Sequence, residues 1–142
     1  MAIRRSANAV WKGNLQDGAG TISAPGGVLN QTPYSFKTRF GDTPGTNPEE
    51  LIAAAHAGCF TMATSFALQN AGFTASQLDT RADLTLEQSS GGFTITGVHL
   101  TMRASVPGIS TEQFQEIAAG AKANSPVSKV LNCPITLEAT LD

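Results

Sequence analysis

Cys59 has the clearest potential for chemistry, because it lies in the middle of the longest apolar stretch of the chain. This stretch covers residues 47–72, and between residues 51 and 68 its only ionisable side chains are His56 and Cys59. Free cysteine often packs as a small buried hydrophobe, and apolar surroundings raise the pKa of a thiol and leave it inert. A positive neighbour favours the nucleophilic thiolate instead. The stretch alone therefore allows two interpretations, core packing or a reactive thiol.

Arg39 is the candidate for the positive neighbour, and Glu49 or Glu50 could hold its guanidinium in a bidentate ion pair. Each residue also has a simpler explanation. The two glutamates suit the first turn of a helix, where the helix dipole favours anions, and Arg39 could be an exposed charge on a strand. His56 lies one turn before Cys59, and we interpret it as a hydrogen-bonded core residue rather than a catalytic one.

The rest of the composition excludes several functions. The two histidines and two cysteines give poor support for a metal site, and no phosphate loop, serine elbow or dinucleotide fingerprint is present, so we expect no metal and no cofactor. A net charge of −2 with 14% charged residues gives no basic surface for nucleic acid. Two cysteines without a CxxC pair fit a reducing cytoplasm.

No membrane segment is expected, although residues 47–72 are long enough to cross a bilayer. The stretch is rich in alanine, begins with two glutamates and contains several polar side chains, which favours a buried helix of a soluble protein. Arg4 and Arg5 are not followed by the apolar stretch of a signal peptide. We therefore expect a cytoplasmic protein.

The long apolar stretch carries the signals of a single helix. Thr46 or Asn47 can cap it, Pro48 suits its first position, and Gly72 suits the position just beyond its end. Its roughly 24 residues would span about 36 Å. Because it is apolar on nearly every face, it should be buried on every face.

Strands and shorter helices are predicted on both sides of this helix. Alternating side chains predict strands at 7–11, 20–23 and 34–40, the last with Arg39 on its polar face. Two longer strands follow at 78–87 and 93–104, with a bulge at Gly97 where the alternation changes phase. Helices at 110–124 and 126–131 precede a last strand at 135–141.

This order predicts an α+β fold in one domain over residues 1–142, with helices on one face of an antiparallel sheet. A single small sheet covers only one side of the long central helix. We therefore expect an intertwined, obligate homodimer in which the central helices of two chains pack together. The alternative is a monomer whose sheet curls around the helix.

Four segments carry a recognisable pattern: VLNQTPYSFKTRF (28–40), GTNPEELIAAAHAGCF (45–60), VPGIS (106–110) and SPVSKVL (125–131). In this order and spacing they resemble the osmotically inducible protein C family, which is related to the organic hydroperoxide resistance proteins. The most specific feature is TNPEEL followed by a cysteine ten residues after its first glutamate.

The resemblance implies a thiol-dependent peroxidase that acts on organic hydroperoxides, and on hydrogen peroxide, in oxidative and osmotic stress. It implies intertwined dimers with two active sites at the subunit interface. In this chain Cys59 would be the peroxidatic cysteine, Arg39 the activating arginine and Glu49 the carboxylate that orients it. Glu49 and Cys59 are about 15 Å apart along one helix, so we expect Arg39 to act on Cys59 of the partner subunit.

One position departs from the family pattern. The resolving cysteine usual at the start of the SPVSKVL segment is replaced by Ser125, and the other cysteine is Cys133. Cys133 could resolve the oxidised Cys59 after a local movement, an external thiol or dithiol such as a lipoylated protein could do so, or the activity could be weakened. We favour a one-cysteine peroxidase. The alternative function is not enzymatic: the protein would be a dimer that binds a small apolar ligand or a partner, and Cys59 would be a packed core residue.

Overall fold

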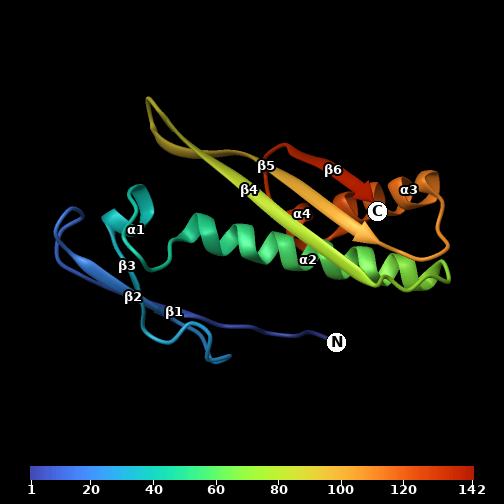
Figure 1. Cartoon of the computed structure of the whole chain (residues 1–142). Helices are drawn as coiled ribbons and strands as arrows, with labels where there is room; N and C mark the ends of the chain where they lie inside the picture. The colour runs from blue at the N-terminus through green and yellow to red at the C-terminus, as the bar shows by residue number, and fades with distance from the viewer. The chain divides into compact units, whose positions relative to one another are not determined.

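Three short strands begin the chain and form their own antiparallel sheet, in the order β1-β2-β3 (Figure 1). The computed structural model describes all 142 residues and divides them into two compact units, residues 1–51 and 52–142. The elements of the first unit are β1 (Asn8–Lys12), β2 (Ala19–Ser23), β3 (Thr32–Tyr34) and α1 (Phe36–Phe40).

Two aromatic rings pack closely against Gly20 in β2 and leave no space for a larger residue there. Trp11 lies opposite Gly20 in β1, and Tyr34 lies opposite it in β3. The centroids of the two rings are 5.4 Å apart, and a Cβ atom at position 20 would lie 2.5 Å from the Tyr34 ring. Glycine therefore allows the aromatic pair to pack across the middle strand.

The predicted strand at 34–40 is wrong beyond Tyr34, because the chain turns into the short helix α1. Ser35 caps this helix in a capping box: its Oγ accepts from the Thr38 N–H at 3.2 Å, and the Ser35 N–H donates to Thr38 Oγ1 at 2.8 Å. Phe36 and Phe40 pack with their ring centroids 4.9 Å apart. Arg39 consequently lies in the last turn of a helix and not on the face of a strand.

The predicted long helix is confirmed as α2 (Pro48–Asn70), whose amino end is capped by Asn47 and which is followed by Gly72 at φ 91°. Every fourth residue along one stripe is buried, and Met62 and Phe66 outside that stripe are 77% and 66% exposed in the single chain. The expectation of burial on every face is therefore not met within one chain. The buried residues are His56, Phe60, Thr64 and Leu68.

The second unit contains a sheet of order β4-β5-β6, in which β4 and β5 form the predicted long hairpin (Figure 1). Thr85 faces Gly97 and Leu86 faces Ile95, so Thr96 is the extra residue of a bulge beside Gly97, as predicted. The elements are β4 (Gln77–Ser89), β5 (Gly92–Ser105), α3 (Thr111–Asn124), α4 (Pro126–Val130) and β6 (Ile135–Leu141).

The α+β class is confirmed, but the sheet is not wholly antiparallel. β6 runs parallel to β5, from Val98 opposite Ile135 to Ala104 opposite Leu141. A parallel pair needs a long crossover, and here α3 and α4 supply it. The single predicted sheet is in fact two three-stranded sheets, one in each unit.

The hydrophobic core of the second unit lies between α2, β5 and α3. Alternate side chains of β5 face it, which confirms the phase change predicted at Gly97. By length and hydropathy α2 could also cross a membrane, a test that core helices of soluble proteins pass as well. Fully buried core side chains are Phe60, Leu68, Leu100, Met102, Phe114 and Ala118.

Candidate active site

The structure brings Arg39 and Glu49 together in a bidentate ion pair. Arg39 Nε donates to Glu49 Oε1 at 2.8 Å, and Nη2 donates to Oε2 at 3.0 Å. Hydrogen bonding to Glu49 raises the pKa of Arg39, and partial burial opposes this only in part. The side chain of Glu49 is 13% exposed and that of Arg39 39%, so the guanidinium is fixed from one edge and open on another.

Local capping places the two partners. Arg39 is in the last turn of α1 and Glu49 in the first turn of α2. Asn47 connects the two helices, because its Nδ2 donates to the Thr38 carbonyl at 3.0 Å while its Oδ1 accepts from the Glu50 N–H at 2.8 Å. Glu50 makes no ion pair with Arg39, so Glu49 is the carboxylate that the geometry selects.

An apolar cavity of about 300 Å³ lies beside Arg39. The guanidinium carbon is 5.4 Å from the centroid of the Phe40 ring, a distance suited to a cation–π contact. The sequence did not predict this cavity, because it is built from residues of β1, β3, α1, the start of α2 and the connection after β1. Its lining is Trp11, Leu15, Tyr34, Ser35, Phe36, Arg39, Phe40 and Pro48.

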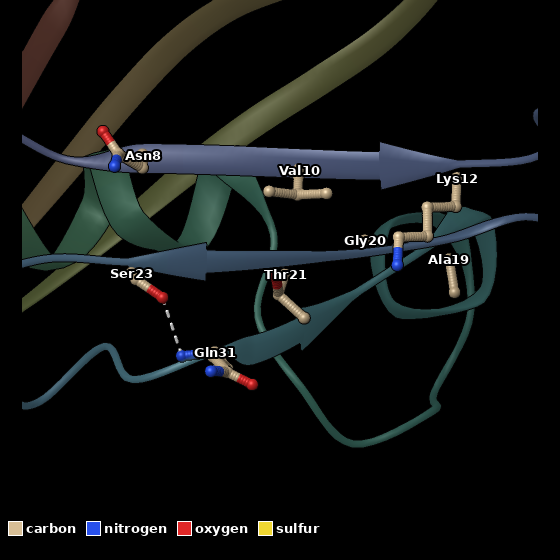
Figure 2. Close-up of a pocket in the computed structure, with 8 residues that line it drawn as sticks. All are labelled: Asn8, Val10, Lys12, Ala19, Gly20, Thr21, Ser23 and Gln31. Atoms are coloured by element: carbon tan, nitrogen blue, oxygen red, sulfur yellow. Dashed lines mark hydrogen bonds between the residues drawn. The ribbon is translucent and has the colours of Figure 1, made fainter.

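A second hollow, of about 540 Å³, lies along the other face of the first sheet (Figure 2). Val10 and Lys12 line it, and they alternate with Trp11, which lines the apolar cavity. Gln31 closes one end, where its N–H donates to Ser23 Oγ at 2.8 Å. The lining contains no thiol, histidine or carboxylate, so it offers no group for peroxide chemistry.

Cys59 and Cys133 are both free thiols and both partly buried. Cys59 lies on α2 beside its buried stripe, in the second unit, whereas Arg39 and Glu49 belong to the first. Cys133 lies between α4 and β6 and packs against the hydrophobic core. The structure thus assembles the predicted ion pair and leaves the two predicted cysteines unbonded.

A buried hydrogen-bond chain occupies the position where the family pattern has a second cysteine. Ser125 and His56 are fully buried and Ser128 is 8% exposed. Ser125 Oγ lies 2.8 Å from Ser128 Oγ, which lies 2.7 Å from His56 Nε2. The interpretation of His56 as a hydrogen-bonded core residue is therefore confirmed, and burial lowers its pKa.

The hydroxyl of Ser125 serves both the cap of α4 and the buried hydrogen-bond chain. Ser125 Oγ accepts from the Ser128 N–H at 3.3 Å, and its hydroxyl donates to Ser128 Oγ at 2.8 Å. Ser128 Oγ in turn hydrogen-bonds to His56 Nε2, and which of the two donates depends on the tautomer of the imidazole. His56 Nδ1 is buried without a partner. The sequence predicted Ser125 as a cap but did not indicate Ser128.

Two solved structures show the same fold. An OsmC-like protein of unknown function from Vibrio cholerae has a TM-score of 0.77 at 18% identity, over 97% of this chain and 99% of that one. The organic hydroperoxide resistance protein OhrB of Bacillus subtilis has a TM-score of 0.67 at 22% identity, over 96% and 98%. These likenesses define the fold.

Sequence comparison then identifies the family. The model of the OsmC-like proteins matches residues 40–140. The chain is 50% identical over 141 residues to peroxiredoxin OsmC of Escherichia coli (strain K12), covering 99% of both, and 31% identical over 123 residues to OhrB of Bacillus subtilis (strain 168), covering 84% of this chain and 88% of OhrB. The chain belongs to the OsmC-like family.

Proposed function

We propose that this protein is a cysteine-based peroxidase that reduces organic hydroperoxides, and hydrogen peroxide, in defence against oxidative and osmotic stress. The single observation that carries the proposal is the bidentate Arg39–Glu49 pair, because such a pair presents an oriented positive charge suited to a thiolate. The names of relatives, peroxiredoxin OsmC and organic hydroperoxide resistance protein, support the same reaction.

In the proposed reaction the Cys59 thiolate attacks the outer oxygen of the hydroperoxide. The sulfur–oxygen bond forms as the oxygen–oxygen bond breaks, so sulfur is oxidised by two electrons and the peroxide is reduced. The outer oxygen and its proton remain on sulfur as a sulfenic acid, and the leaving alkoxide takes up a proton to become an alcohol, or water from hydrogen peroxide. Arg39 favours the thiolate form of Cys59 and holds the peroxide, while Glu49 holds Arg39.

The proposed active form is a homodimer. The exposed Met62 and Phe66 of α2 form an apolar face that a second copy of α2 would cover. Glu49 and Cys59 are about 15 Å apart along α2, so antiparallel packing of two such helices would carry each ion pair toward Cys59 of the partner subunit. Residues 1–142 then act as one domain in a cytoplasmic dimer.

We propose that the sulfenic acid is reduced from outside the chain. Ser125 has no thiol and is fully buried in a hydrogen-bond chain, and Cys133 packs against the core at the start of β6. A first external thiol would displace water to give a mixed disulfide, and a second would release Cys59. A dithiol, such as a lipoyl group on a protein, would supply both thiols.

Peroxide consumption in the presence of dithiothreitol tests the proposal. Wild type and Cys133→Ser should consume cumene hydroperoxide, and Cys59→Ser should not. Alkylation by iodoacetamide near pH 6 gives a second test, because an activated thiolate reacts rapidly and a packed thiol slowly. Slow alkylation of Cys59 together with no consumption would favour a non-enzymatic dimer that binds an apolar ligand in the 300 Å³ cavity.

A further inference from the structure

We propose that His56 is the hydrogen-bond partner of Cys59 in its oxidised state: Nδ1 of the imidazole pairs with the oxygen of the Cys59 sulfenic acid and so protects this intermediate. The inference rests on the proposed peroxidase function and deepens it. Three observations carry it: one ring nitrogen of His56 is fixed, the other is buried without a partner, and Cys59 lies one turn further along α2.

The imidazole of His56 is fixed through Nε2, which lies 2.7 Å from Ser128 Oγ. Ser128 is held in turn by Ser125, whose Oγ accepts from the Ser128 N–H and donates to Ser128 Oγ. His56 and Ser125 are fully buried and Ser128 is 8% exposed. Because turning the ring would break the bond to Ser128, Nδ1 has to find its partner where it lies.

The buried Nδ1 is the group that needs a partner. A buried polar atom without a hydrogen bond is rare, since it has lost its bond to water and gained none in exchange. Burial also lowers the pKa of His56, so at pH 7 the ring is neutral and has one donor and one acceptor nitrogen. Either tautomer suits a sulfenic group: a protonated Nδ1 donates to the oxygen, and a bare Nδ1 accepts from its hydroxyl.

The helix places Cys59 beside this nitrogen. Side chains three residues apart on a helix are neighbours, with about 5–6 Å between their Cβ atoms. Because helical side chains lean toward the amino end, that of Cys59 is directed back over the turn that carries His56. Both residues belong to the second unit, and Cys59 is only partly buried. The oxygen that the peroxide adds to the sulfur extends this side chain by one atom and narrows the gap to Nδ1.

Protection of the sulfenic acid matters in this chain because Ser125 replaces the resolving cysteine of the family pattern. In the proposed cycle the oxidised Cys59 waits for an external thiol. During that time a second hydroperoxide can oxidise the sulfur by two further electrons to a sulfinic acid, and is itself reduced to an alcohol. A hydrogen bond that engages the sulfenic oxygen should slow this loss about threefold to tenfold.

Two conservative substitutions separate the two nitrogens of the ring. The amide of glutamine reaches the position of Nε2, so His56→Gln keeps a partner for Ser128 and removes Nδ1. The shorter amide of asparagine lies near the position of Nδ1, so His56→Asn keeps that group and gives up the bond to Ser128. Thr64→Val is the matched control, because Thr64 is fully buried on the same stripe of α2 and its Oγ1 donates to the Phe60 carbonyl of its own helix.

The kinetic readout is the conversion of Cys59 sulfenic acid to sulfinic acid, followed by mass spectrometry in excess cumene hydroperoxide without a thiol. Its rate constant should rise about threefold to tenfold in His56→Gln and stay within about twofold of wild type in His56→Asn and Thr64→Val. The first oxidation of the thiolate should be unchanged in all three, because His56 pairs with the oxygen only after its transfer. Equal rate constants in His56→Gln and wild type, or equal rises in both His56 variants, would overturn the inference.

A second measurement uses the wild-type protein and depends on no variant. The chain has two histidines, and His99 is the internal reference, because its Nδ1 already lies 2.6 Å from Thr136 Oγ1 on an exposed part of the second sheet. In nitrogen NMR spectra of the imidazole rings, one equivalent of cumene hydroperoxide should shift the Nδ1 resonance of His56 and leave those of His99 in place. An unshifted His56 beside a Cys59 that mass spectrometry shows to be oxidised would overturn the inference and leave the peroxidase function intact. A Cys59 that stays reduced would overturn the peroxidase function, and the inference with it.

Discussion

Replacing Glu49 with alanine should slow the reaction of Cys59 with peroxide while leaving the protein folded. Glu49 holds Arg39 by two hydrogen bonds, of 2.8 and 3.0 Å, and alanine removes both. The positive charge of Arg39 remains, but its guanidinium is no longer fixed. The variant therefore tests whether orientation of Arg39, rather than its charge alone, contributes to the reaction.

The expected magnitude follows from side-chain entropy. An arginine side chain carries about 2 kcal/mol of rotamer entropy, and without Glu49 most of it must be lost again in the transition state. Since about 1.4 kcal/mol of activation free energy changes a rate constant tenfold, the reaction should slow by up to about thirtyfold. The contact between the guanidinium and the Phe40 ring still restricts Arg39 and reduces the effect toward about tenfold. The stability change should be small, below about 1 kcal/mol, because Arg39 is 39% exposed.

The assay is the second-order rate constant of Cys59 oxidation by cumene hydroperoxide, measured in a single turnover by stopped flow. Thermal unfolding of the same samples reports stability. Glu50→Ala is the matched control, because Glu50 is the neighbouring carboxylate and makes no ion pair with Arg39. Arg39→Lys should resemble Glu49→Ala, since lysine keeps the charge and loses the bidentate fork.

A rate constant for Glu49→Ala within about twofold of wild type would refute the role assigned to the ion pair. Equal losses in Glu49→Ala and Glu50→Ala would refute it as well, because they would point to the general charge of the helix terminus and not to the bidentate geometry. A loss accompanied by a large fall in melting temperature would mean that the pair stabilises the fold instead of orienting Arg39.

Four further predictions follow from burial and hydrogen bonding. Burial lowers the pKa of His56 below 6.5, so just below that pH only the unfolded chain gains a proton at this residue. The free energy of unfolding, measured by urea titration, should therefore fall as the pH drops from 7 through 6, and it should fall less in His56→Gln. Ser128→Ala should lower the free energy of unfolding by about 1–3 kcal/mol, because His56 Nε2 loses its partner. The double substitution of Met62→Lys and Phe66→Lys places two charges on the exposed apolar face of α2. It should convert the dimer to a monomer in analytical ultracentrifugation and abolish peroxidase activity. Cys133→Ser should keep dithiothreitol-dependent turnover within about twofold of wild type, whereas a large loss would make Cys133 the resolving cysteine.

Elements specified by local signals were predictable from the sequence. The helix α2 has a cap, a proline, two glutamates and a terminal glycine, and each acts within a few residues. The bulge beside Gly97 followed from a change of phase in the alternation. The short helix α1 was missed because Phe36 and Phe40, four residues apart, fall on one face under a period of two and also on one face of a helix. The capping box at Ser35 decides between them.

Features that depend on distant contacts were not predictable. The parallel alignment of β6 with β5 depends on the crossover through α3 and α4, which no pattern within β6 records. The hydrogen bond between Ser128 and His56 joins residues 72 positions apart in the chain. The family resemblance was the source of the roles expected for Arg39, as the activating arginine, and for Glu49, as the carboxylate that orients it. The residue types alone indicated only that an arginine held by a carboxylate can favour a thiolate.

The central claim is that Cys59 is the sulfur atom that the peroxide oxidises. The most direct test is mass spectrometry of the protein after one equivalent of cumene hydroperoxide, with dimedone present to trap sulfenic acid. The account predicts a dimedone adduct on Cys59, an unmodified Cys133 and one equivalent of 2-phenyl-2-propanol. An unmodified Cys59 with the hydroperoxide intact would contradict it.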